Sequence, residues 1–150
     1  MTVRVQSDDF DAGVEMARLR AGNPRIGAVV SFIGTVRDLN DGQGVSTLTL
    51  EHYPGMTERS LADICDQARA RWDLEDLLVI HRYGEFRPMD QIVLVVTTSA
   101  HRGEAFLACE FIMDYLKTQA PFWKKESTAQ GERWVQARDT DDVAAQRWSE

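Results

Sequence analysis

The sequence predicts an α+β fold in which a mixed or antiparallel sheet packs against helices. Segments with the apolar period of helices and of strands alternate along the chain, so both kinds of element contribute to the core. The turns between them lack the glycine-rich pattern of a nucleotide-binding fold, which disfavours a doubly wound parallel sheet. A chain of 150 residues has the length of one domain, and we expect residues 1–150 to form a single one.

The first half of the chain predicts a helix, two strands and a second helix. Asp8 or Asp9 can cap a helix that runs to about residue 20, because an aspartate oxygen accepts the free N–H groups of a first turn. The apolar, β-branched run 26–33 predicts a buried strand. Residues 45–53 alternate in polarity, as a half-buried strand does. Thr57 can cap the second helix, which ends near residue 72.

The second half predicts two strands, a third helix and a last short strand. Residues 77–83 and 91–99 are the strands, and the second is apolar enough to be central in the sheet. The third helix covers about 102–118 and cannot continue through Pro121. Residues 134–138 predict a short strand, and we expect the acidic tail 139–150 to be loose.

Composition excludes several classes of function. The net charge of −7 argues against general nucleic-acid binding, which needs a basic face. No secretory leader and no apolar stretch of membrane-spanning length is evident. Cys65 and Cys109 lie on apolar helical stripes and form neither a disulfide framework nor a metal pattern. A reduced, cytoplasmic protein with no metal and no cofactor is therefore expected.

The segment 112–126 concentrates positive charge in an acidic chain. Lys117 ends the third predicted helix, and Lys124 and Lys125 follow Pro121 and two aromatic residues. Lysines on either side of a turn can face each other across a pocket for an anionic ligand. The simpler alternatives are a lysine whose stem lies on the core and a charged edge strand. Since adjacent strand residues point to opposite faces, at most one of Lys124 and Lys125 joins Lys117.

Three further cations lie where strands end. His101 and Arg102 follow the strand 91–99 and open the third helix, a junction that suits anions. Arg37 follows the first buried strand. The alternatives are that His101 only caps the helix and that Arg37 is an ordinary solvated arginine. From the residues alone, the prediction is a cationic pocket for an anionic ligand, without a named reaction.

Four segments in order resemble the large, catalytic subunit of molybdopterin synthase. They are FIGTVR (32–37), LEHYPGM (50–56), SAHR (99–102) and FIMDYLKTQAPFWKKE (111–126). Several ordered motifs are far more specific than any one of them. The resemblance covers nearly the whole chain and implies a hammerhead-like α/β arrangement.

The resemblance also implies a reaction and partners. The family converts cyclic pyranopterin monophosphate into molybdopterin by installing a dithiolene. The sulfur comes from a small ubiquitin-like subunit that carries a thiocarboxylate on its C-terminal Gly-Gly tail. A homodimer of large subunits, with a small subunit at each end, forms a heterotetramer. A non-catalytic scaffold for a ubiquitin-like tail and an unrelated phosphate-ester enzyme are the alternatives.

The resemblance assigns roles to individual residues. Lys117 would be the main acid/base catalyst, and Lys124 would assist it and hold anionic groups. Arg138 resembles a residue contributed by the dimer partner. The substrate-binding set that the resemblance implies is Thr35, Val36, Arg37, His101, Arg102, Lys117, Lys124, Lys125, Glu126 and Arg138.

Overall fold

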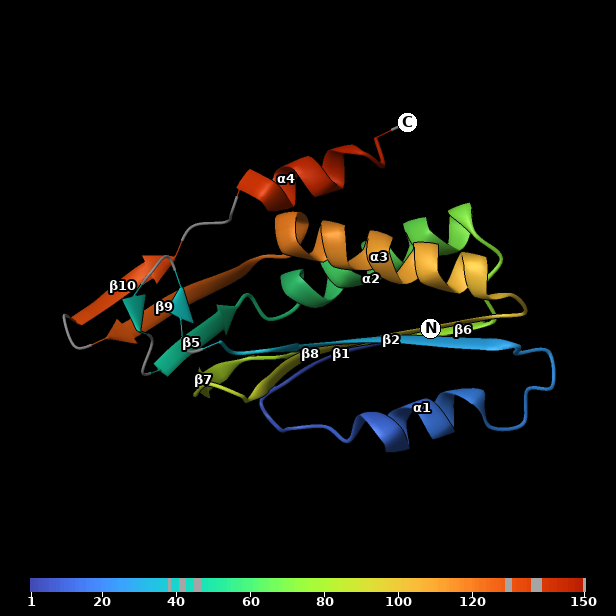
Figure 1. The fold of residues 1–150 in the computed structure, drawn as a ribbon, viewed down its shortest axis with the longest axis horizontal. Helices are drawn as coiled ribbons and strands as arrows, with labels where there is room; N and C mark the ends of the chain where they lie inside the picture. The colour runs from blue at the N-terminus through green and yellow to red at the C-terminus, as the bar shows by residue number, and fades with distance from the viewer. Residues whose placement is uncertain (38, 41–42, 45–46, 129–130, 136–138, 150) are drawn as a thin grey trace.

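The computed structural model describes residues 1–150 except 38, 41–42, 45–46, 129–130, 136–138 and 150. Strands and helices alternate along the chain (Figure 1). In chain order they are β1 (Thr2–Gln6), α1 (Ala12–Arg20), β2 (Ala28–Thr35), β3 (Leu39–Asn40), β4 (Gln43–Gly44), β5 (Thr47–His52), α2 (Met56–Arg71), β6 (Asp76–Arg82), β7 (Gly84–Phe86), β8 (Gln91–Ser99), α3 (Arg102–Gln119), β9 (Phe122–Thr128), β10 (Gly131–Val135) and α4 (Asp139–Gln146).

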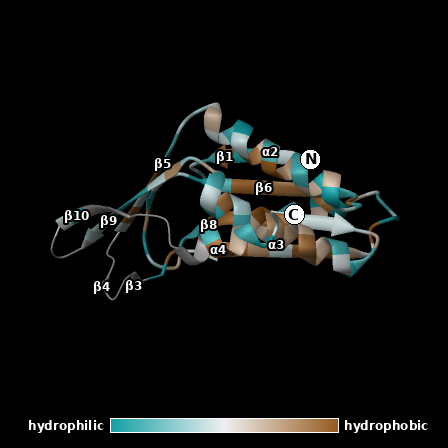
Figure 2. Ribbon diagram, turned by 90° about the horizontal axis from the view of Figure 1, so that it is seen from above, coloured by the Kyte–Doolittle hydropathy of each residue, from teal (hydrophilic) through white to brown (hydrophobic). Residues whose placement is uncertain are grey.

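The main sheet has the strand order β1-β6-β8-β2. β1 is parallel to β6, and the β6–β8 and β8–β2 pairs are antiparallel. Helices α2 and α3 cover one face and α1 covers the other (Figure 1). β6 and β8 are buried along most of their length, and β6 is among the most hydrophobic segments in Figure 2. The predicted mixed sheet packed with helices is therefore confirmed.

A second, antiparallel sheet extends beyond one end of the main one. Its strand order is β10-β9-β5-β7, and α3 leads directly into it through Ala120 and Pro121. Leu48 and Leu50 of β5 point into the core, as the alternation of 45–53 predicted. β9 lies between β10 and β5, so the alternative that its lysines mark an edge strand is wrong.

Two predicted helix caps are corrected by the structure. Asp11, not Asp8 or Asp9, caps α1, since its side-chain oxygen accepts the N–H of Val14 at 3.1 Å. Gly55 occupies the cap position of α2 with a φ of 84°, a conformation that favours glycine. Thr57 lies inside the first turn of α2 and is fully buried.

The C-terminal segment differs from the loose tail that we expected. Residues from Asp139 form α4, which packs on α3. Arg147 forms ion pairs with Glu110 and Asp114 of α3, both at 2.6 Å. Trp148 donates its Nε1–H to Asp114 at 2.6 Å. An acidic composition alone suggested a solvated tail, but these pairs cross more than thirty residues of sequence and have no local signal.

Candidate active site

The turn between α3 and β9 positions the two lysines that the sequence singled out. Lys117 lies in the last turn of α3 and is half-buried. Pro121 prevents further helix, and β9 begins at Phe122. Lys124 pairs in register with the buried Leu50, so it points to the inner face of the second sheet.

Thr57 fixes this turn from the side of α2. Its Oγ1 donates a hydrogen bond to the main-chain oxygen of Pro121 at 3.0 Å. The hydroxyl oxygen of Thr57 in turn accepts a hydrogen bond from the N–H of Tyr53, also at 3.0 Å. One buried hydroxyl therefore connects the end of β5, the start of α2 and the segment between Lys117 and Lys124.

A buried histidine lies beside both lysines. His81 of β6 is 6% exposed, and its ring stacks on Phe122 with centroids 3.7 Å apart. Burial is the main cause that lowers the pKa of His81 to about 3, and the neighbouring Lys117, Lys124 and His52 lower it further. The ring of Phe122, on which His81 stacks, lies five residues after Lys117 and two residues before Lys124. We call Lys117, Lys124 and His81 the lysine cluster.

Lys125 and Glu126 are placed differently from Lys124. Lys125 pairs in register with Thr49 and Trp134, and its ammonium lies 3.5 Å from Glu132 on β10. The prediction that only one of the adjacent lysines joins Lys117 agrees with this geometry. The backbone of Glu126 continues β9 opposite Leu48, and the structure describes only that backbone.

The end of β2 lies at the same end of the main sheet as the lysine cluster. Thr35 pairs with Gln91 at the start of β8, and α3 returns over the sheet toward that start. Val36 is buried and bonded to the turn after β7, where its N–H donates to Asp90 at 3.0 Å. Thr35 and Arg37 are exposed.

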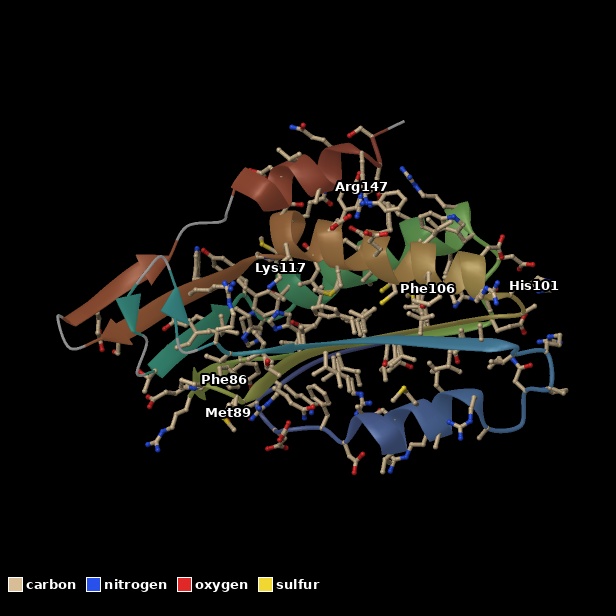
Figure 3. All side chains as sticks on the ribbon, in the orientation of Figure 1. Phe86, Met89, His101, Phe106, Lys117 and Arg147 are labelled. Carbon is tan, nitrogen blue, oxygen red and sulfur yellow. The ribbon has the colours of Figure 1, made fainter. Side chains whose placement is uncertain are left out.

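His101 and Arg102 lie at the opposite end of α3 from the lysine cluster (Figure 3). Sixteen residues separate His101 from Lys117, which is roughly 24 Å at a rise of about 1.5 Å per residue. A small ligand cannot touch both ends within one protomer. His101 occupies the cap position of α3, but its side chain forms no capping hydrogen bond. The alternative that His101 only caps the helix is therefore not supported. Arg138 lies outside the described residues.

The two cysteines are unsuited to nucleophilic chemistry. Burial raises the pKa of both Cys65 and Cys109 to about 12, so neither forms a thiolate near neutral pH. In the described part of the chain, no group of three His, Cys, Asp or Glu side chains could hold a metal ion. Within the same residues, no helix is long and apolar enough to cross a membrane.

Sequence reasoning overlooked two residues of this site. His81 is absent from the predicted site, and Thr57 was predicted only as a helix cap. The one feature of the sequence that points to His81 is its position directly after the apolar run 77–80, because it is a titratable residue in a buried strand. Thr57 has no sequence signal, because its partner Pro121 is 64 residues away.

The fold and the two lysines at the α3–β9 turn define an α+β protein with a cationic candidate site. Comparison with known families identifies it further: the chain belongs to the MoaE protein family, which it matches over residues 5–119.

Individual relatives agree with this assignment over nearly the full chain. The molybdopterin synthase catalytic subunit of Ralstonia nicotianae is 71% identical over 98% of this chain and 84% of its own length. The solved molybdopterin biosynthesis MoaE protein of Burkholderia ambifaria is 57% identical, with a TM-score of 0.85 over 99% of this chain and 98% of its own. The molybdopterin synthase of Staphylococcus aureus is 30% identical, with a TM-score of 0.82 over 89% of this chain and 96% of its own.

Proposed function

We propose that this protein is the catalytic subunit of a molybdopterin synthase in molybdenum cofactor biosynthesis. It transfers sulfur from the thiocarboxylated C-terminus of a small ubiquitin-like subunit to cyclic pyranopterin monophosphate, forming the dithiolene. Membership of the MoaE family supports the reaction. The observation that carries the proposal is the α3–β9 turn, which has Lys117 at the end of α3 and Lys124 opposite the buried Leu50 on β9.

The cluster suits the charges of this reaction. The substrate phosphate and the thiocarboxylate are both anions, and two lysines compensate for both. Lys117 acts as the main acid/base residue, and Lys124 holds anionic groups and stabilises charge as the cyclic phosphate opens. The buried cysteines supply no thiolate, so the sulfur has to arrive on the partner chain.

The remaining predicted binding residues divide between two places. Thr35, Val36 and Arg37 lie toward the lysine cluster and bind the substrate beside it. His101 and Arg102 are too distant to join the cluster of their own protomer, because they lie at the first end of the 18-residue helix α3 and Lys117 lies in its last turn. We therefore assign them to the site of the second protomer in a homodimer within the heterotetramer. Exposed apolar side chains on β2 and α3 support an interface between protomers at these two elements. They are Phe32, Ile33, Phe106 and Leu107.

The assignments of Arg138, Lys125 and Glu126 follow from the resemblance alone. Arg138 contributes to the partner's site, and Lys125 and Glu126 support the binding stretch of β9. A cytoplasmic location is proposed because the described cysteines are free thiols, as is usual in a reducing compartment.

A reconstituted turnover assay tests the proposal. The protein is mixed with a thiocarboxylated small subunit and the cyclic pyranopterin, and molybdopterin is detected as its oxidised fluorescent derivative. Product that requires all three components is expected. A stable complex without product would instead indicate a scaffold, and hydrolysis of simple phosphate esters without the partner would indicate a phosphate-ester enzyme.

A further inference from the structure

His81 is a buried titratable residue to which the proposed reaction gives no role. It ends a buried segment of β6 whose preceding residues, 77–80, are all apolar. Its ring lies flat on Phe122, with an angle of 21° between the planes. Phe122 begins the strand that carries Lys124 two residues later. The imidazole therefore packs against the base of the lysine cluster.

One hydrogen bond determines the tautomer of His81. Its Nδ1 lies 2.9 Å from the main-chain oxygen of Arg82. A carbonyl oxygen only accepts, so Nδ1 carries the hydrogen. Because burial holds the pKa of the ring far below neutrality, Nε2 carries no proton. Nε2 is then a hydrogen-bond acceptor that bears no charge.

Titratable groups from three other elements influence this ring. Lys117 lies on α3, Lys124 on β9 and His52 on β5, and of these three Lys117 affects His81 most. On β6 itself, the guanidinium of Arg82 is bonded to the main-chain oxygens of Ser7 and Gln91. A lysine ammonium has three donors and no acceptor, so Lys117 and Nε2 are chemically complementary.

We propose that His81 is a positioning residue whose Nε2 accepts a hydrogen bond from the Lys117 ammonium and directs it toward the substrate. This role rests on the proposed function. A carboxylate in the same place would also orient the lysine, but its charge would repel the phosphate and the thiocarboxylate. A neutral imidazole orients the ammonium and leaves the site cationic.

Three variants separate the two ring nitrogens. In His81→Asn the side-chain amide reaches the position of Nδ1, in His81→Gln it reaches that of Nε2, and His81→Phe keeps only the ring. Hydrogen bonds to charged groups are worth ~1.5–3 kcal/mol, so we expect kcat to fall by about tenfold to a hundredfold in the Phe and Asn variants. The Gln variant should recover most of this loss. If the Asn variant is at least as active as the Gln variant, the bond to Arg82 is what matters and the proposal is wrong.

A second readout does not depend on turnover. Competitive acylation of the lysines at a series of pH values, followed by mass spectrometry, gives the apparent pKa of Lys117 in each variant. Loss of an acceptor destabilises the ammonium, so this pKa should fall by about one unit or more in His81→Phe and His81→Asn. Lys125, which pairs with Glu132 on β10, is the internal reference.

The two readouts distinguish the possible failures. An unchanged titration of Lys117 in His81→Phe overturns the positioning role, whatever happens to kcat. A shifted titration in a protein that never forms molybdopterin supports the role of His81 and refutes the synthase function. Thermal unfolding of each variant at neutral pH confirms that it is folded before either result is interpreted.

Discussion

At the scale of single residues, neighbouring lysines on β9 offer a direct comparison. Lys124 is opposite Leu50 on the inner face, whereas Lys125 is paired with Glu132. We expect Lys124→Ala to lower kcat/KM about a hundredfold, because a preorganised cation at developing charge is worth that much. Lys125→Ala removes a partly exposed ion pair and should cost less than about fivefold. Steady-state kinetics in the reconstituted assay measures kcat/KM of both variants. Equal losses of kcat/KM would contradict the assignment of Lys124 to the inner face and of Lys125 away from the site.

The buried His81 also makes stability depend on pH. The unfolded chain binds this proton near its ordinary pKa of 6.5, and the folded protein binds it only near 3. Between these values the unfolded state holds more protons, so the free energy of unfolding rises with pH. The contribution of His81 to the free energy of unfolding is complete above about pH 6.5 and is lost as pH falls. The free energy of unfolding then changes by up to about 1.4 kcal/mol per pH unit.

Urea unfolding between pH 7 and 5 measures this slope. The interval lies above the ordinary pKa values of Asp9 and Glu75, 3.8 and 4.5, which are lowered further in the fold. His81→Phe should flatten the dependence even if its stability differs at every pH. Parallel slopes for the variant and the natural protein would show that the buried imidazole is not responsible.

Single residues also show what sequence reasoning can and cannot reach. Lys117 and Lys124 were recognisable because Pro121 separates them by a turn in a locally cationic segment. Their convergence on His81 was not, since β6 and β9 approach each other only through tertiary packing. The pairing that aims Lys124 inward depends on the register with β5, and one sequence does not specify a register between distant strands.

At the scale of elements, the connection between α2 and the α3–β9 turn should control the geometry of the site. Thr57→Val keeps the shape but removes the bonds to Tyr53 and Pro121. The partly buried carbonyl of Pro121 and N–H of Tyr53 then lose their partner, at a cost of about 1–3 kcal/mol in unfolding free energy. We also expect kcat to fall several-fold, because Pro121 lies between Lys117 and Lys124, and Thr57→Ser should restore both quantities.

Thr98→Val is the matched control for this experiment. Thr98 is also fully buried, and its hydroxyl forms two comparable bonds, both to the main chain of Asp76. It lies at the far end of the main sheet from Lys117. The control should lose similar stability with a smaller change in kcat, and an equal loss of kcat would mean that Thr57 acts only through overall stability.

The elements themselves were predictable to different degrees. β8, α3 and α2 carry long, clear apolar periods, and their predicted ranges agree with the structure to within about two residues. β1 and β7 were not predicted, since short strands at sheet edges have little pattern of their own. α4 was missed because its attachment depends on Arg147 and Trp148 reaching Asp114, a contact that composition does not encode.

At the scale of the whole molecule, α3 separates two groups of predicted binding residues. Lys117 lies at one end of the helix and His101 at the other (Figure 3), where Arg102 is the first helical residue. The sequence motifs predicted that all of these residues bind the substrate. The motifs do not show that a whole helix keeps the two groups apart within one protomer. A site that uses both groups has to combine two protomers, and a symmetric dimer contains two such sites.

Complementation between inactive variants tests this arrangement. Lys117→Ala and Arg102→Ala are each expected to be folded, able to bind the small subunit and nearly inactive. In a mixed dimer, one site receives both substitutions and the other receives neither. Random exchange of subunits makes half of the dimers mixed, so roughly a quarter of the sites should be intact and activity should return to that level. If each site were built within one protomer, every site would carry one substitution and mixing would restore nothing.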